Sequence, residues 1–305
     1  DDVQFKNCGL VLADEQHRFG VNQRRLLSAK GDRVDFLLMS ATPIPRTMAN
    51  VLFGDLDIST IEQYHATKAK VITTLIPSLD IFAMDTPIQA ALANHQQVYV
   101  VCPAIETDEE GELADVQTVH KALSKHYPQI VIEMLHGKLP NETKEAVLKR
   151  FYDQTVRILV TTTVIEVGIN VPTANVMIIH HADRFGLSQL HQLRGRIGRG
   201  QVEGQCYLLS DADNPESLAR LQVVVESSDG FKIAEKDLEL RGPGELFGLK
   251  QSGIPSFLIA NVITDQKILM TALQDAINVV DHPGDPQNKA WIADCLVEHS
   301  TQLLD

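Results

Sequence analysis

The chain has 305 residues, of which 44% are hydrophobic and 22% are charged, and its formal net charge is −13 at pH 7. This length suggests about two domains, the composition excludes wholesale disorder, and the lack of a long apolar run excludes a membrane span, so we expect a cytoplasmic protein without a membrane partner. The negative charge argues against nucleic acid as a partner, because phosphate contacts need Lys and Arg, and a DNA-binding interpretation therefore depends on local patches and motifs.

Short apolar runs alternate with stretches of helical periodicity over the first two-thirds of the chain, which favours an α/β fold with mostly parallel sheets. Helical patterns fall between most of the runs, as at Glu142–Phe151 and Ser188–Ile197. The predicted buried strands are Leu10–Ala13, Phe36–Met39, Val71–Ile76, Val98–Val101, Ile130–Met134, Ile158–Val160, Val176–Ile179 and Cys206–Leu209.

The pattern changes at two places along the chain. Glu62–Lys70 lacks a clear period between two α/β blocks, so we expect a linker there. After about Asp211 the pattern becomes helical, with a Gly-rich loop at Arg241–Gly253. The helices predicted in this part are Pro215–Glu226, Phe231–Leu240, Thr264–Val280, which has one apolar face, and Asn288 to about Leu303.

The four cysteines are scattered and form no Cys-x-x-Cys pair: Cys8, Cys102, Cys206 and Cys295. This spacing suggests neither a zinc site nor a disulfide framework. We expect small, buried apolar residues instead.

Two polar clusters follow predicted strands near the start of the chain. Asp14 and Glu15 end the first strand, where an Asp can hold Mg²⁺ beside nucleotide phosphates and a Glu can orient the attacking water. Paired acids at such a place are also common as solvated turn residues. Ser40-Ala-Thr42 follows the second strand, and a capped helix start is its plain interpretation because Pro45 suits a first helical turn.

Two further clusters lie in the middle of the chain. Thr162 and Thr163 follow a strand and precede the turn at Gly168, and hydroxyls and backbone N–H groups there can grip phosphate oxygens. A β-branched strand end is the alternative. Arg196 and Arg199 lie three apart and share one face if this stretch is helical, where they can neutralise charge on a transferring phosphoryl group. A solvated basic face is the alternative.

The four clusters occur in the order used by helicases of superfamily 2, which this chain resembles over nearly its whole length. Residues 14–17 resemble motif II, 40–42 motif III, 162–170 motif V and 192–199 motif VI. The resemblance implies a RecA-like, parallel-sheet helicase fold with ATP bound between two lobes.

Longer strings narrow the resemblance to the RecG family and its relative, the transcription-repair coupling factor. These strings are Asp14–Gly20, Ala41–Arg46 and Phe185–Arg194, and Asp229–Gly253 resembles the translocation motif of both. Gln16 and the Arg-Gly-Pro-Gly string favour RecG. Asn170 departs from the usual Asp of motif V, keeping the side-chain carbonyl but losing the charge.

The resemblance also implies a role for each matching residue. The residues implied in catalysis are Asp14 with Mg²⁺, Glu15, Gln192, Arg196 and Arg199, and those implied in nucleotide contact are Gly168, Asn170, Arg196 and Arg199. The residues implied in coupling ATP hydrolysis to movement are His17, Ser40, Thr42, Arg241 and Gln251. The residues implied in DNA contact are Thr162, Thr163 and Arg241. The implied cofactors are ATP and Mg²⁺.

The implied domains are the end of a first lobe (1–66), a second lobe (67–211), a translocation hairpin and loop (212–260) and a helical tail (261–305). The implied function is that of a monomeric, ATP-dependent double-stranded DNA translocase of the bacterial cytoplasm. Such an enzyme remodels stalled forks and branch-migrates Holliday junctions in DNA repair and recombination.

No Gly-x-x-x-x-Gly-Lys-Ser/Thr phosphate loop occurs in the sequence, so we interpret the chain as part of a longer helicase and expect it to be inactive alone. Two alternatives stay open. One is a transcription-repair coupling translocase. The other is a non-catalytic module that retains the helicase fold.

Overall fold

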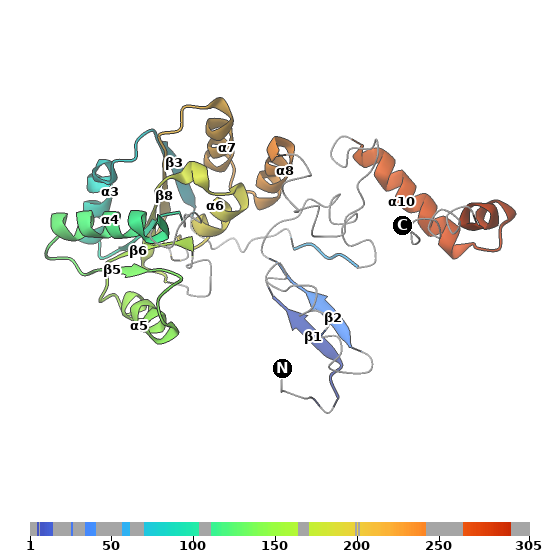
Figure 1. Ribbon diagram of the computed structural model, residues 1–305, viewed down its shortest axis with the longest axis horizontal. Coiled ribbons are helices and arrows are strands. Elements are labelled where there is room, and N and C mark those ends of the chain that lie inside the picture. The colour runs from blue at the N-terminus through green and yellow to red at the C-terminus, as the bar shows by residue number, and fades with distance from the viewer. Residues whose placement is uncertain are drawn as a thin grey trace. The chain divides into compact units, whose positions relative to one another are not determined.

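The computed structural model contains two compact units, residues 1–44 with 60–240, and residues 45–59 with 241–305 (Figure 1). The first unit holds two sheets, and the second holds helix α10 (Gln266–Asp281). The residues that the structure describes are 5, 7–14, 26, 34–40, 57–61, 70–103, 111–163, 171–198, 200, 202–241 and 265–293.

The larger of the two described sheets is entirely parallel, with the strand order β3-β8-β7-β4-β6-β5. Parallel neighbours need crossover connections, and helices supply most of them here. The strands are β3 (Val71–Ile76), β4 (Gln97–Val101), β5 (Ile132–Leu135), β6 (Ile158–Thr161), β7 (Ala174–Ile179) and β8 (Gly204–Leu209).

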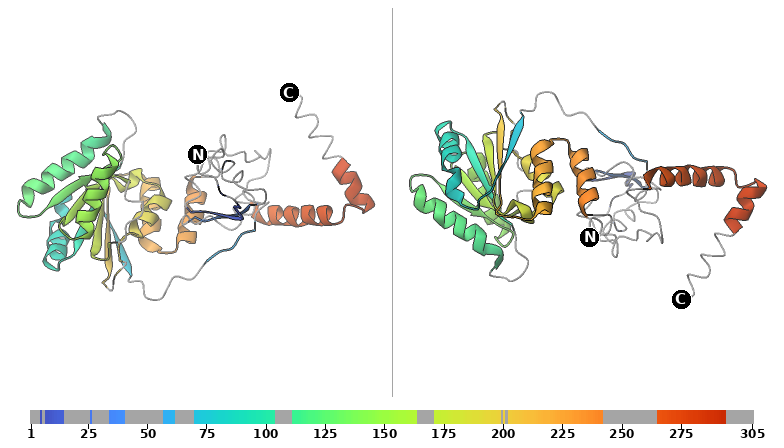
Figure 2. Two further views of the ribbon diagram at one scale, coloured as in Figure 1. Left: turned by 90° about the horizontal axis from the view of Figure 1, so that it is seen from below. Right: turned by 90° about the horizontal axis from the view of Figure 1, so that it is seen from above.

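Helices cover both faces of this sheet (Figure 2). The 3₁₀ turn η2 and helices α3 and α4 lie on one face, and helices α5 to α8 contribute to the core on the other. Their bounds are η2 Ile81–Met84, α3 Asp85–Ala93, α4 Gly111–His126, α5 Asn141–Tyr152, α6 Leu187–Arg194, α7 Pro215–Glu226 and α8 Gly230–Arg241. A second 3₁₀ turn, η4 (Ala182–Arg184), joins β7 to α6.

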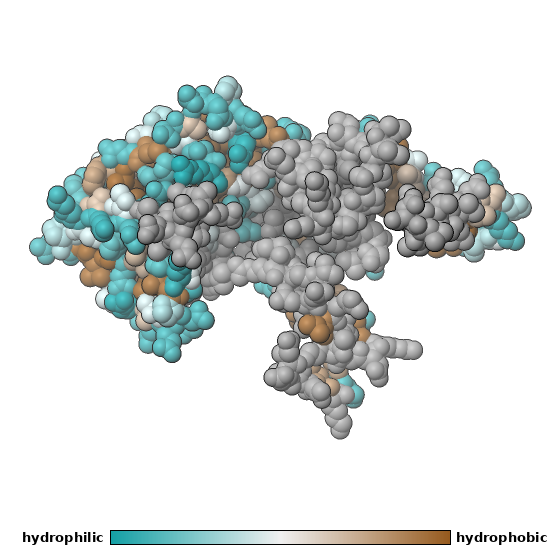
Figure 3. Space-filling view, viewed as in Figure 1, coloured by the Kyte–Doolittle hydropathy of each residue, from teal (hydrophilic) through white to brown (hydrophobic). Residues whose placement is uncertain are grey.

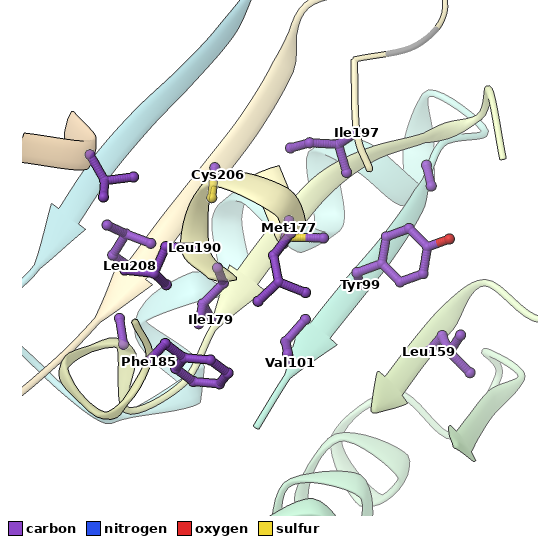
Figure 4. Close-up of a cluster of buried hydrophobic side chains, with 14 of the residues drawn as sticks. Tyr99, Val101, Leu159, Met177, Ile179, Phe185, Leu190, Ile197, Cys206 and Leu208 are labelled. Carbon is purple, nitrogen blue, oxygen red and sulfur yellow. The ribbon is translucent and has the colours of Figure 1, made fainter. Parts of the chain in front are cut away.

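Successive side chains of each central strand point alternately into the two cores, one on each face of the sheet. On β4, Tyr99 and Val101 point to the core beneath α5 to α8, whereas Val98 and Val100 point to the core beneath α3 and α4. Figure 4 shows the first of these cores, with Phe185 and Leu190 packed near the strand residues. Burial on both faces explains why these strands read as continuous apolar runs in the sequence.

Helix α7 has a well-defined start that the sequence determines. The Asn214 side chain accepts a hydrogen bond from the Ser217 backbone N–H at 2.7 Å, and Pro215 occupies the first turn. This cap satisfies a backbone donor that no intrahelical carbonyl could reach, and the fixed φ of Pro suits that position.

The second described sheet of this unit has two parallel strands, β1 (Leu10–Ala13) and β2 (Asp35–Leu38). Their register pairs Leu10 with Asp35 and Ala13 with Leu38. Several apolar side chains of this sheet are exposed among the described residues, including Leu12 and Leu37 at 59% and 50%.

The predicted strands are all confirmed as strands, with bounds that differ by up to two residues. Two of them, Leu10–Ala13 and Val71–Ile76, match the structure at both ends. The prediction that the strands are buried is wrong for β1 and β2, in which Leu10, Leu12 and Leu37 are exposed. The predicted run Ile130–Met134 begins as a strand only at Ile132. The expected linker at Glu62–Lys70 lies outside the described residues except for Lys70.

Helices α7, α8 and α10 confirm the helical pattern predicted after Asp211. The last predicted helix is confirmed in part, because the described residues 286–293 are helical. The visible surface over the sheet and its helices is mostly hydrophilic (Figure 3). Among the residues that the structure describes, no helix has the length and apolar character needed to cross a bilayer.

Candidate functional site

Asp14 and Ser40, from two different motifs, lie at the same edge of the two-stranded sheet. The backbone N–H of Met39 donates to the carbonyl oxygen of Ala13 at 2.8 Å, so the segments that lead to these two residues are hydrogen-bonded to each other. Both Asp14 and Ser40 are exposed. The carboxyl ends of parallel strands are where ligands bind in open α/β sheets, so the first two motifs meet at an edge suited to a ligand.

Thr162 and Thr163 lie at the carboxyl edge of the six-stranded sheet, directly after β6. The Thr162 backbone N–H donates to the carbonyl oxygen of Leu135 at 3.2 Å, which extends the pairing of β6 with β5. The Thr162 side chain is buried, with 5% exposed, and Thr163 is half-buried. Of the two hydroxyls, that of Thr163 is therefore the more accessible to a ligand.

Helix α6 carries Gln192 at the surface of the same domain. Its apolar face buries Leu187, Leu190 and Leu193 completely against the sheet. Gln192 is partly exposed, and so is Arg196, which follows the helix. Two of the residues predicted to act in catalysis are therefore outside the core.

One prediction about this segment is wrong. We predicted a helix over Ser188–Ile197, but α6 ends at Arg194, and Arg196 lies beyond its C-terminus. Gly195 caps the helix, and Gly198 has a φ of 67°, a conformation that glycine adopts without strain. Arg196 is therefore not on a helical face that it could share with Arg199.

Arg194 is buried, with only 5% of the residue exposed, and the motif analysis did not single it out. Its guanidinium donates to the carbonyl oxygens of Val224 at 2.6 Å and Ser227 at 2.7 Å, at the end of α7. It also donates to Nδ1 of His191 at 3.0 Å, because an arginine can only donate. Arg194 thus ties the helix of motif VI to the helical pair that follows.

A signal for Arg194 is present in the sequence. Leu187, Leu190 and Arg194 are spaced at i, i+3 and i+7, which places Arg194 on the apolar face of α6. An arginine at such a position needs buried acceptors. The carbonyl groups at a helix C-terminus provide them, because the last four lack intrahelical donors.

Arg241 is the last residue of α8, so its backbone is helical rather than part of the predicted loop. The other site residues predicted from the motifs lie outside the described residues: Glu15, His17, Thr42, Gly168, Asn170, Arg199 and Gln251. Their roles stay predictions.

Two of the three cysteines that the structure describes confirm the prediction of buried packing residues. Cys102 and Cys206 are buried, with 0% and 1% exposed, whereas Cys8 is partly exposed and the prediction is wrong for it. Burial raises the pKa of both buried thiols to about 12, with Asp115 adding to the effect on Cys102. Thiols held protonated in this way are poor nucleophiles and poor metal ligands.

Two families match the sequence in turn along the chain. Residues 83–201 match "Helicase conserved C-terminal domain", which spans most of the six-stranded sheet. Residues 227–298 match "ATP-dependent DNA helicase RecG, domain 3, C-terminal", which begins at the α7–α8 connection.

Curated relatives match over nearly the whole chain. ATP-dependent DNA helicase RecG of Staphylococcus aureus (strain NCTC 8325 / PS 47) is 44% identical over 283 residues, which are 92% of this chain and 41% of the relative. RecG of Staphylococcus epidermidis (strain ATCC 12228 / FDA PCI 1200) shows the same identity and coverage. The chain therefore spans less than half the length of these relatives.

Solved structures of helicases are also similar to this chain. A structure of RecG bound to a three-way DNA junction matches with a TM-score of 0.67 and 42% identity, covering 88% of this chain and 34% of that one. The helicase MrfA bound to DNA matches at a TM-score of 0.54 and 15% identity, over 72% of this chain and 34% of that one, which supports the fold alone.

The six-stranded parallel sheet, with polar residues at its carboxyl edge, is thus a RecA-like helicase domain. The chain belongs to the RecG family and corresponds to a C-terminal part of its relatives.

Proposed function

We propose that these residues form part of an ATP-driven motor that unwinds and remodels branched DNA, such as stalled replication forks and Holliday junctions, in repair and recombination. The observation that carries the proposal is the similarity over most of the chain to RecG, including a structure of RecG on a three-way DNA junction. The match to RecG domain 3 favours this function over transcription-coupled repair.

ATP would bind at the carboxyl edges of the sheets, with the division of roles that the motifs predict. Asp14 fits a ligand of Mg²⁺, because it is an exposed carboxylate directly after a parallel strand. Hydrolysis of bound ATP supplies the free energy. Gln192 and Arg196, which are accessible beyond the core face of α6, would hold the phosphates. Glu15 would orient water, and Arg199, Gly168 and Asn170 would complete the contacts of the second lobe.

DNA would pass over the carboxyl edge of the six-stranded sheet, where Thr163 has an accessible side chain beside the buried Thr162. Hydroxyls contact phosphates without reading sequence, which suits a motor that moves along any duplex. Arg241, where the predicted Gly-rich loop begins, would make the second contact.

Arg194 supports a route by which motion of the nucleotide-contacting segment reaches the DNA contact. It joins α6 to the end of α7, and the short connection Ser227–Asp229 leads into α8, which ends at Arg241. Within this unit, α6, α7 and α8 also share one core. A shift of α6 would therefore move the helical pair as one body. From the motif resemblance, we propose functional segments at 1–66, 67–211, 212–260 and 261–305. His17, Ser40, Thr42 and Gln251 would have coupling roles.

The test uses the complete protein that contains these residues, on a synthetic fork, with ATP turnover and strand separation measured in parallel. Arg241→Ala is expected to retain at least part of the DNA-stimulated hydrolysis but to lose unwinding, because Arg241 lies outside the nucleotide motifs. Arg150→Ala is the matched control, since Arg150 is half exposed and pairs with Glu133 on the surface. Unwinding that stays in proportion to turnover in Arg241→Ala would count against the coupling role. A complete wild-type protein that neither hydrolyses ATP with DNA nor opens forks would refute the function.

A further inference from the structure

Three potential metal ligands meet where β7 and β8, neighbours in the sheet, come to an end. His181 follows β7, Asp183 lies in the 3₁₀ turn η4, and Asp211 follows β8. One ligand atom from each of the three side chains lies within 4.8 Å of the others. No residue of this group belongs to the helicase motifs described above.

The position of Asp183 is fixed by a second layer of hydrogen bonds. The Ser210 hydroxyl donates to Oδ1 of Asp183 at 2.6 Å, and the same hydroxyl oxygen accepts from the backbone N–H of Ala212 at 3.1 Å. Metal-binding carboxylates are oriented by partners of this kind. The carboxylate is therefore already held between the ends of two strands.

His181 is also held in place. Its backbone is left-handed, with φ of 51° and ψ of 51°, which is uncommon for a residue other than glycine although histidine is among the more tolerant types. Its ring stands edge-on to the ring of His180, with centroids 4.6 Å apart. His180 is itself buried, and its Nε2 lies 2.9 Å from the Leu79 carbonyl oxygen, which fixes the His180 ring in position. The His181 ring therefore packs against a side chain that is held in place.

The charged groups around His181 favour a cation. Among the described residues, the carboxylates of Asp115 and Asp183 act on His181 against the guanidinium of Arg184. The Asp211 carboxylate adds a further negative charge at the same place. Imidazole is the commonest side-chain ligand for metals in proteins.

We propose that His181, Asp183 and Asp211 bind one divalent transition-metal ion, with Zn²⁺ as the fitting case. One imidazole and two carboxylates are ligands typical of Zn²⁺, whereas Mg²⁺ and Ca²⁺ prefer all-oxygen sites. Tetrahedral coordination puts ligand atoms about 3.3 Å apart, so the three atoms need to converge by at most roughly 1.5 Å. Asp211 is exposed and can rotate to close this gap, and water fills the fourth position.

A bound ion would fasten the segment that leads into α6 to the end of β8. That segment comprises η4 and the two residues after it, and α6 carries Gln192 and Arg194. The ion would thus stabilise the start of the helix on which the nucleotide-contacting residues depend. This role is structural and is independent of the Mg²⁺ that Asp14 would hold.

The test uses the untagged 305-residue chain, from which metal has first been removed with a chelator. ZnCl₂ is then titrated into the chain and the binding is measured by calorimetry. We expect one Zn²⁺ per chain, and at least about tenfold weaker binding in Asp183→Asn and in His181→Ala, since loss of even an outer partner costs that much. Co²⁺ in place of Zn²⁺ is expected to give the visible absorption of a tetrahedral site, and the variants are expected to lose it. Because Asp183→Asn is isosteric and can still accept from Ser210, it decides the question even if His181→Ala fails to fold.

The matched control is His126→Ala, which removes another histidine beside a carboxylate, because Nε2 of His126 lies 3.0 Å from Oδ1 of Asp85. This variant is expected to bind Zn²⁺ as the wild-type chain does. No stoichiometric binding by the wild-type chain, unchanged binding in Asp183→Asn, an equal loss in His126→Ala, or displacement of Zn²⁺ by equimolar Mg²⁺ would each overturn the proposal.

Discussion

Arg194 offers the sharpest test of how this domain is held together. Its guanidinium is buried and donates at 2.6 and 2.7 Å to the carbonyl groups of Val224 and Ser227. A hydrogen bond from a charged donor contributes about 1.5–3 kcal/mol, and Arg194→Ala removes both of these bonds and leaves the two carbonyl groups without this donor. We therefore expect Arg194→Ala to lower the free energy of unfolding by about 3–5 kcal/mol.

The measurement is equilibrium urea unfolding of the 305-residue chain, followed by circular dichroism. Arg194→Lys keeps the charge but offers a point donor in place of a fork, so its loss should be intermediate. Arg150→Ala is the control, because the surface pair of Arg150 with Glu133 should contribute no more than about 1 kcal/mol. If Arg194→Ala and Arg150→Ala shift the midpoint equally, Arg194 does not tie α6 to α7.

Three further predictions concern other parts of the domain. Asn214→Ala should lower the free energy of unfolding by about 1 kcal/mol in the same urea assay, because α7 loses its N-cap. Asn214→Ser should keep most of this free energy, since Ser is also a good N-cap. Equal stability of the wild-type chain and both variants would contradict this. The thiols of Cys102 and Cys206 ionise near pH 9 when unfolded but near 12 when folded, so the native chain binds more protons between these values and its stability should fall there by about 1.4 kcal/mol per pH unit for each thiol. Cys206→Ala should flatten that slope, and an unchanged slope would show that the thiol is not protected. In the complete protein, Arg196→Ala should reduce DNA-stimulated ATP turnover by about 10³-fold while leaving the circular dichroism spectrum unchanged, and near wild-type turnover would favour a solvated loop residue.

The architecture of the sheet could be predicted from the sequence because its central strands are buried on both faces. The predicted runs Val98–Val101 in β4 and Val176–Ile179 in β7 are hydrophobic at every position. Such runs cannot be amphipathic helices, and their spacing leaves room for crossovers. The ends of α7 were predictable for a different reason, since Asn214 and Pro215 mark its start.

The details of the site could be predicted only in part. That Asp14 and Ser40 share one sheet edge follows from the parallel order of the strands that precede them. The end of α6 could not be predicted from spacing, because the periodicity of Ser188–Ile197 continues across Gly195, where the chain actually turns. The grouping of His181 with Asp211 depends on β7 and β8 being neighbours, and strand order is a tertiary property that no local pattern contains.

The arginines of motif VI show why residue type alone misleads. In a basic motif near phosphates, each arginine is expected to bind the ligand, yet Arg194 and Arg196 differ by environment. Arg194 lies on the apolar face of α6 and donates hydrogen bonds to carbonyl groups at the end of α7. Arg196 lies past the end of α6 and is partly exposed. Arg194 is only 5% exposed and its guanidinium is bonded within the domain, so it is poorly placed to contact a phosphoryl group. The structure therefore divides the motif into one arginine that joins helices and another that is partly exposed. We expect loss of Arg194 to lower the free energy of unfolding rather than to act directly on ATP turnover.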